Sequence, residues 1–236
     1  MTLCVQTIPS LYGIYTIDRQ AKCKTNQHML KEITTALAQG LRWLQARFKS
    51  PLADDINLLI DIALLTRQYS AQLIVNDHID WLEVLLKHPQ IQPKDNYSLL
   101  ASQSSQPPLP GLHIGQSDHS LLASRQRLGP HICIGQTCHN SIDHAIKAQA
   151  QQASYVAFGR FFQSDTKPTA QAAELATLAQ AHQRLHLPIA VIGGITATNI
   201  ANLLTFKPAL IAVDKALWQG QSIAQNYGQF ITAINS

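Results

Sequence analysis

A repeated unit constrains the fold of this chain more than any other feature of its sequence. The unit is a short apolar strand followed by an amphipathic helix. The predicted strands lie at residues 11–16, 41–47, 72–75, 111–114, 132–135, 155–158, 189–192 and 210–213. The predicted helices lie at residues 27–39, 54–69, 79–86, 120–128, 141–151, 170–185, 198–204 and 223–234. Strands that alternate with helices pair in parallel, and eight such units predict an α/β fold closed as a (β/α)8 TIM barrel. An open doubly wound sheet is less favoured, since no G-x-G-x-x-G motif opens a helix.

Length and composition agree with a single barrel domain over residues 1–236. The 236 residues are 46% hydrophobic, which is enough for one large core. The rhythm breaks at about residues 88–110, where Pro, Ser and Gln accumulate, and we interpret this stretch as a loop insertion. It is either a tolerated surface excursion or a lid over a site.

Charge and cysteine content exclude several protein classes. The 18 basic and 14 acidic residues form no clustered basic stripe, so we expect no nucleic-acid partner. No apolar run approaches the roughly 18 residues of a membrane span, and the chain start lacks a secretory pattern. Its four cysteines form no C-x-x-C pair. We therefore expect a reduced, cytoplasmic protein that acts on small molecules. The sequence is compatible with a monomer or a homo-oligomer.

Polar side chains follow the predicted strands at their C-terminal ends, which is where TIM barrels carry their active sites. After the second strand, Gln45, Arg47 and Lys49 alternate along the chain and therefore share one face. Similar polar ends follow the third to eighth strands. Any one of them could be an ordinary loop, but their convergence on one rim predicts a functional site.

The residue types on this rim indicate phosphorylated ligands. Two carboxylates, Asp77 and Asp118, could share one Mg²⁺ whose other ligands are waters and phosphate oxygens, although each could instead cap a helix. Gly193-Gly194 after the seventh strand suits a backbone-amide cradle for a second phosphate. Three cations suit a polyphosphate; they are Arg47, Lys49 and Lys167. The pattern suggests that two phosphorylated substrates are joined with loss of pyrophosphate.

The ordered motifs resemble the thiamine phosphate synthase family. They are Gln45-x-Arg47-x-Lys49, Asn76-Asp77, His113-x-Gly-Gln-x-Asp118, Gly135-x-Thr137-x-His139, Thr166-Lys167 and Ile-Gly-Gly-Ile at 192–195. The resemblance covers about residues 11–217. It implies a TIM barrel that requires Mg²⁺ and couples hydroxymethylpyrimidine diphosphate with thiazole phosphate, giving thiamine phosphate and pyrophosphate.

The resemblance also implies roles for single residues. Gln45 would contact the pyrimidine, and Thr137 stands where the family usually has a serine near the pyrimidine and pyrophosphate. Asp77 and Asp118 would bind Mg²⁺. The pyrophosphate would be held by Arg47, Lys49, Asn76 and Lys167. The thiazole phosphate would lie against Ser164, Thr166, Gly194, Asp214 and Lys215. The implied mechanism is dissociative: pyrophosphate departs first, and the thiazole nitrogen captures the pyrimidine-methyl cation.

The chain departs from the family pattern in two places that matter for the thiazole phosphate. Gln163-Ser164 replaces the usual proline and threonine, and Asp214-Lys215 replaces a hydrophobic-serine pair. Two alternatives are kept. One is a thiazole tautomerase-like barrel, which uses a histidine after the fifth strand, where His139 lies. The other is a non-catalytic, thiamine-related ligand-binding paralogue.

Overall fold

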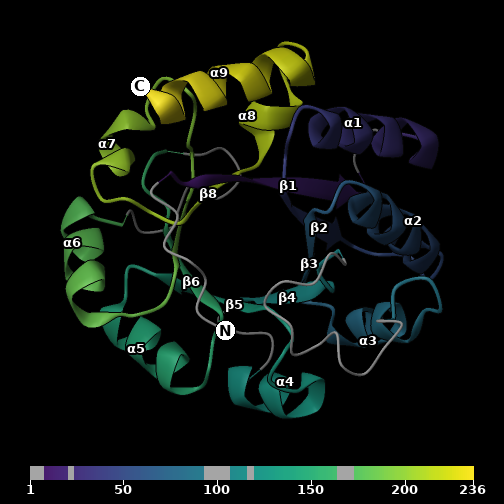
Figure 1. Ribbon diagram of the computed structural model, residues 1–236, viewed down its shortest axis with the longest axis horizontal. Helices are drawn as coiled ribbons and strands as arrows, with labels where there is room; N and C mark the ends of the chain where they lie inside the picture. Colours follow the sequence, from purple (N-terminus) through teal and green to yellow (C-terminus); the bar gives the residue numbers. More distant parts are fainter. Residues whose placement is uncertain (1–7, 21–23, 93–106, 116–119, 164–172) are drawn as a thin grey trace.

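The computed structural model describes residues 8–20, 24–92, 107–115, 120–163 and 173–236. Eight parallel strands form a closed barrel in the order β1 to β8, and Figure 1 shows the helices as a ring around it. The strands are β1 (Ser10–Asp18), β2 (Trp43–Lys49), β3 (Gln72–Asn76), β4 (Gly111–Ile114), β5 (Ile134–His139), β6 (Tyr155–Gly159), β7 (Ile189–Ile192) and β8 (Leu210–Val213). The helices are α1 (Asn26–Ala38), α2 (Asp55–Gln68), α3 (Ile79–Lys87), α4 (Leu121–Leu128), α5 (Ile142–Ala150), α6 (Leu175–Arg184), α7 (Ala201–Leu204), α8 (Lys215–Trp218) and α9 (Ile223–Asn235). The predicted TIM barrel is confirmed.

Most predicted elements lie within three residues of the observed bounds, whereas the start of α6 and the end of β5 lie further away and α8 was not predicted. The prediction for β5 began two residues too early and ended four too early, because the polar run after Gly135 continues in the strand and pairs with β6. Helix α8 was not predicted, since four residues are too few to show a helical period. Of the predicted insertion, residues 93–106 lie outside the described part, whereas Ile91 before them is fully buried.

Alternating side chains of the strands build two layers of core. The residues that point outward pack under the helices, as Tyr15, Leu44 and Phe48 do. The residues that point inward form a second, smaller cluster, which is aromatic at Tyr12 and Tyr155. Because the strands are parallel and in register, the inward rows continue to the mouth formed by the C-terminal strand ends.

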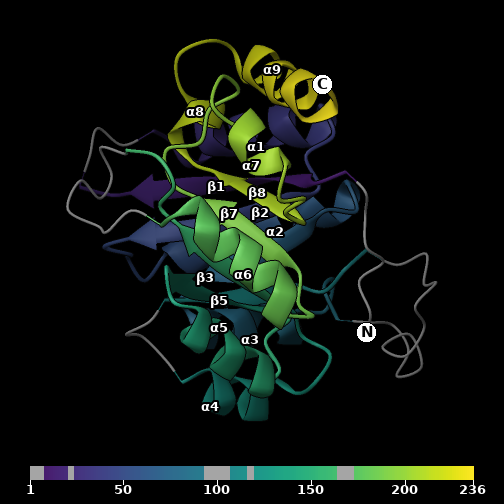
Figure 2. The same ribbon diagram turned by 90° about the vertical axis from the view of Figure 1, so that its left-hand side faces the viewer.

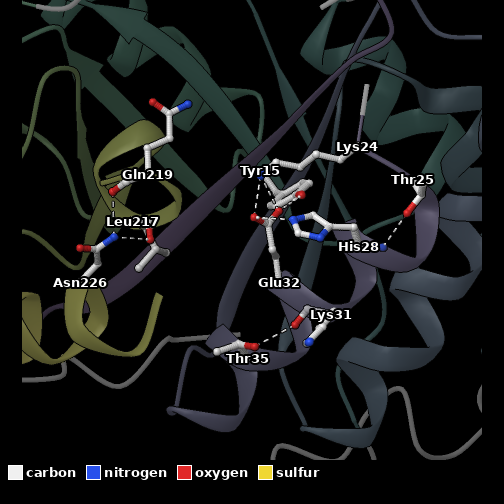
Figure 3. A network of polar contacts seen from close by, with 10 residues as sticks. All are labelled: Tyr15, Lys24, Thr25, His28, Lys31, Glu32, Thr35, Leu217, Gln219 and Asn226. Atoms are coloured by element: carbon white, nitrogen blue, oxygen red, sulfur yellow. Dashed lines mark hydrogen bonds and ion pairs between the residues drawn. The ribbon is translucent and has the colours of Figure 1, made fainter. Parts of the chain in front are cut away.

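Polar contacts fasten the helices that close the barrel between β8 and β1. In both overall views α9 lies beside α1 and α8 (Figures 1 and 2). Figure 3 shows the Asn226 amide of α9 donating to the carbonyls of Leu217 and Gln219, at 3.1 and 3.0 Å, which holds the end of α8. The Trp218 indole N–H donates to the Ile14 carbonyl at 2.7 Å, so α8 is also tied to β1. Among the described helices, none has the length and apolar character needed to cross a membrane.

Candidate active site

The inward row of β2 rises from the barrel interior to the mouth. Gln45 is buried, with 3% of its surface exposed, whereas the Lys49 side chain is 40% exposed, and Arg47 lies between them in the row. The parallel register places Arg47 beside Thr16 and Lys49 beside Asp18 of β1. Lys49 Nζ lies 3.7 Å from the Asp18 carboxylate. The two predicted phosphate-binding cations therefore occupy the mouth, as the alternation in the sequence indicated.

The end of β8 joins this group of cations. The Thr16 hydroxyl donates to the Asp214 carboxylate at 3.3 and 3.4 Å. Burial raises the pKa of Asp214, and the positive charges of Arg47, Lys49 and Lys215 oppose that rise. The predicted residues of the second and eighth strands are thus brought together. An internal carboxylate partly balances the cations.

Asp77 is fixed at the turn between β3 and α3. Its backbone has φ +63°, a conformation that costs energy for most residues but that Asp and Asn tolerate. One carboxylate oxygen accepts from the Gly115 backbone N–H at 2.9 Å, and the other accepts from the Asn76 amide. Its own N–H donates to the His113 carbonyl at 2.9 Å, so Asp77 is bound to β4 by main chain and side chain.

The end of β5 carries a bulge. The register with β6 shifts between Thr137 and His139, and His139 has φ +50°. Bulges of this kind redirect side chains beside active sites. The Asn140 side-chain oxygen accepts hydrogen bonds from the Glu174 N–H and the Thr177 hydroxyl, which ties this end of β5 to the beginning of α6.

Gly193 and Gly194 allow the segment after β6 to lie directly on the turn after β7. Their φ angles are +104° and +64°, and a Cβ on Gly194 would lie 2.4 Å from the Gln163 carbonyl oxygen. The Phe162 N–H donates to the Gly193 carbonyl at 3.0 Å. Over the described ranges, no acceptor receives the backbone N–H of Gly194 or of Ile195.

A chain of hydrogen bonds crosses the barrel interior below the mouth. It runs from Gln45 Nε2 to the Tyr12 hydroxyl at 2.8 Å and from there to the Tyr155 hydroxyl at 3.0 Å. His113 continues it, with Nδ1 2.9 Å from the Tyr155 hydroxyl and Nε2 2.8 Å from the Thr137 hydroxyl. Burial lowers the pKa of His113 to about 4 and raises the pKa of both tyrosines, so all three side chains are neutral at pH 7.

Four predicted site residues lie outside the described residues, namely Asp118, Ser164, Thr166 and Lys167. Among the described residues, no group of three or more His, Cys, Asp or Glu side chains gathers as a metal cluster. This does not conflict with a Mg²⁺ site, because Mg²⁺ typically takes only one or two protein carboxylates. The fixed carboxylate of Asp77 fits that need.

The sequence interpretation missed residues that the barrel brings to the site. Thr16 and Asp18 end β1, the one strand end that was not considered, although alternation from Tyr12 would have placed both on the inward row. Tyr12 and Tyr155 lie 143 residues apart in mostly apolar strands, and the pattern of either strand alone gives no sign that they meet.

Comparison with known proteins adds evidence of a different kind. A family model described as thiamine monophosphate synthase matches residues 14–217. A thiamine-phosphate synthase of Saccharophagus degradans is 35% identical over 213 residues, covering 90% of this chain and 88% of that protein. One from Thiobacillus denitrificans is 34% identical over 220 residues, covering 93% and 92%.

The fold is also similar to that of a solved structure. The thiamine phosphate pyrophosphorylase from Pyrococcus furiosus superimposes with a TM-score of 0.73 at 20% identity, covering 96% of this chain and 95% of that one. At this identity the likeness concerns the barrel alone.

Proposed function

The chain belongs to the thiamine monophosphate synthase family and is a transferase, and we propose that its reaction takes place at the barrel mouth described above. The reaction joins hydroxymethylpyrimidine diphosphate to thiazole phosphate and gives thiamine phosphate and pyrophosphate. The comparisons support neither the tautomerase-like nor the non-catalytic alternative. The observation that carries the placement is that β2 and β3 bring two cations and a fixed carboxylate to the same end of the barrel.

The described residues divide between the two substrates. The pyrimidine lies between Gln45 and Thr137, at the two ends of the buried hydrogen-bond chain. The pyrophosphate lies against Arg47, Lys49 and Asn76, with Lys167. The thiazole phosphate takes the N–H groups after β7 and the ammonium of Lys215, with Ser164 and Thr166 from the segment between β6 and α6.

This arrangement suits a leaving group that carries much negative charge. The bond between the pyrimidine methylene carbon and the pyrophosphate oxygen breaks, and pyrophosphate keeps the electron pair. Arg47 and Lys49 stabilise the developing charge with hydrogen bonds that need little reorganisation. The thiazole nitrogen then supplies the electron pair for the new C–N bond. No general base is required, so positioning and charge stabilisation account for the catalysis.

A metal ion fits one part of this site. Asp77 and Asp118 would hold Mg²⁺, which would neutralise charge on the diphosphate and leave its remaining positions to water. Asn76 and the Gly115 N–H keep the Asp77 carboxylate in one orientation. Hydrogen bonds that orient a metal-binding carboxylate in this way typically tune metal affinity.

Pyrophosphate release with both substrates present tests the function. We expect release only when hydroxymethylpyrimidine diphosphate and thiazole phosphate are supplied together, with thiamine phosphate formed in equal amount. Omitting either substrate is the control. A protein that binds both compounds and releases nothing would contradict the synthase function.

The charge of Lys215 provides a narrower prediction at the thiazole-phosphate side. Lys215 is exposed at the start of α8, and its charge acts on Asp214 together with those of Arg47 and Lys49. Lys215→Ser is expected to weaken thiazole phosphate binding by about five- to tenfold, the effect of one partly screened charge. Binding of the pyrimidine diphosphate in the same variant should stay unchanged. Calorimetric titration at low and high salt would count against this role if thiazole phosphate bound both proteins equally.

A further inference from the structure

The hydrogen-bond chain from Gln45 to Thr137 is continuous, and the structure describes all of its members. Its members come from β2, β1, β6, β4 and β5, so it spans the barrel interior. All its bonds are between 2.8 and 3.0 Å, and among the described residues the hydroxyl groups of Tyr12 and Tyr155 hydrogen-bond to no other side chain. Trp43 packs edge-on against both tyrosine rings, with centroid separations of 5.7 and 6.0 Å.

Gly135 shows that the barrel makes room for this chain. A Cβ at Gly135 would lie 2.0 Å from the Tyr155 ring, so only glycine at this position of β5 admits the ring. The His113 ring stacks on the same tyrosine, at 5.6 Å between centroids. Tyr155 is therefore held from the sides by β4 and β5, and its hydroxyl has two fixed neighbours.

Counting donors gives the chain one direction. Gln45 Nε2 can only donate, so the Tyr12 oxygen accepts, and among the described residues the Tyr12 hydrogen has the Tyr155 oxygen as its acceptor. The Tyr155 hydrogen then goes to His113 Nδ1, which must be unprotonated. The proton of the neutral imidazole is therefore on Nε2, and Nε2 donates to the Thr137 oxygen.

This direction determines what the two ends offer to a ligand. The side-chain carbonyl oxygen of Gln45 accepts no hydrogen bond from any residue that the structure describes. It is not fully buried, so a ligand can reach it. The Thr137 oxygen accepts from His113, which leaves its own hydrogen for another acceptor. One end thus presents an acceptor, and the other presents a donor.

We propose that Tyr12, Tyr155 and His113 are positioning residues that couple Gln45 to Thr137, and we call these five residues the relay. The pyrimidine then meets a carbonyl acceptor at Gln45 and a hydroxyl donor at Thr137. The identity of the ligand rests on the proposed function, whereas the direction of the hydrogen bonds is independent of that function. Turning the Gln45 amide by half a turn would reverse every bond and exchange donor for acceptor at both ends. The relay therefore couples its two ends: it presents one acceptor and one donor, and it selects against ligands that need two acceptors or two donors there.

A double-mutant cycle tests the coupling between two residues that do not touch. Thr137→Val is expected to lower kcat/KM for hydroxymethylpyrimidine diphosphate about tenfold. In a Tyr12→Phe background, which already breaks the relay, the same substitution should cost only about twofold. Tyr12→Phe alone should raise KM for the pyrimidine substrate about fivefold and leave KM for thiazole phosphate unchanged.

Tyr15→Phe is the matched control, because Tyr15 is on the same strand but points outward. Its hydroxyl donates to Glu32 of α1, where Lys24 and His28 also meet that carboxylate (Figure 3). The control also removes one tyrosine hydroxyl, yet the Thr137→Val effect should stay at about tenfold in it. If the effects of Thr137→Val and Tyr12→Phe are additive while the wild type is active, the coupling through the relay is overturned and the proposed function stands.

The tautomer of His113 tests the direction of the relay without any turnover. Nitrogen-15 NMR of the ring, assigned by the signals that His113→Gln removes, should show a protonated Nε2 and an unprotonated Nδ1. The opposite tautomer would overturn the proposed direction, whatever the activity. An inactive wild type that still shows the protonated Nε2 would contradict the proposed function but leave the relay in place.

Discussion

Replacing Arg47 or Lys49 with alanine is expected to lower turnover by about one to two orders of magnitude while the barrel stays folded. Each substitution removes a charge-assisted hydrogen bond to the leaving pyrophosphate, worth about 1.5–3 kcal/mol before any extra gain in the transition state. The energy converts to about tenfold to more than a hundredfold in rate. Steady-state pyrophosphate release measures the loss of turnover, and thermal unfolding of each variant tests whether the barrel stays folded.

The fold should survive because β2 is held mainly by its other face. Leu44, Ala46 and Phe48 are buried under the helices, whereas Arg47 and Lys49 line the mouth. Losing Lys49 also breaks its contact with Asp18, but a partly exposed pair of this kind contributes at most about 1 kcal/mol to stability.

Two further variants sharpen this test. Arg47→Lys keeps the charge but loses the planar, two-pronged donor, so we expect it to restore only part of the activity. Lys31→Ala removes a positive charge from the exposed face of α1 and should behave like the wild type. Near-normal turnover in both Arg47→Ala and Lys49→Ala would contradict the pyrophosphate assignment.

The sequence was sufficient for the barrel because its strand signals are local. β4, β7 and β8 have the predicted bounds, since each is a short apolar run between residues that break regular structure. β5 was misjudged because the residues from Gln136 to His139 are mostly polar, and only pairing with β6 and the inward direction of Thr137 make them strand.

The site could be predicted only where its residues follow strand ends along the chain. Arg47, Lys49 and Asp77 were predicted in this way, and each lies at the C-terminal end of its strand. The contact of Thr16 with Asp214 joins residues 198 positions apart, and His113 reaches Tyr155 across the barrel. Such contacts depend on closure of the sheet, and neither strand encodes them by its own period.

The Asp77 carboxylate is expected to make the enzyme dependent on Mg²⁺. Chelation should abolish turnover, and excess Mg²⁺ should restore it. Asp77→Asn should lower the affinity for Mg²⁺ by at least about tenfold and reduce kcat as well, because an amide oxygen carries no net charge for the ion.

Asparagine is the informative replacement because it changes the charge and little else. It tolerates φ +63°, whereas alanine in the left-handed region would add about 1–2 kcal/mol of backbone strain. Its side-chain oxygen can still accept from the Gly115 N–H, whereas the bond from Asn76 loses its acceptor. Thermal unfolding should therefore shift little, and a change in activity can be assigned to the lost carboxylate.

Pyrophosphate binding gives this prediction a readout that does not depend on turnover. In the wild type, Mg²⁺ should strengthen pyrophosphate binding measured by calorimetry, and Asp77→Asn should lose most of that enhancement. Asp61→Asn, on the exposed face of α2, is the matched control for the loss of one carboxylate. Because Arg47 and Lys49 are expected to bind pyrophosphate without help from the metal, metal-independent binding should persist in Asp77→Asn. Full activity in excess chelator, or the same Mg²⁺ enhancement in both proteins, would remove Asp77 from the metal site.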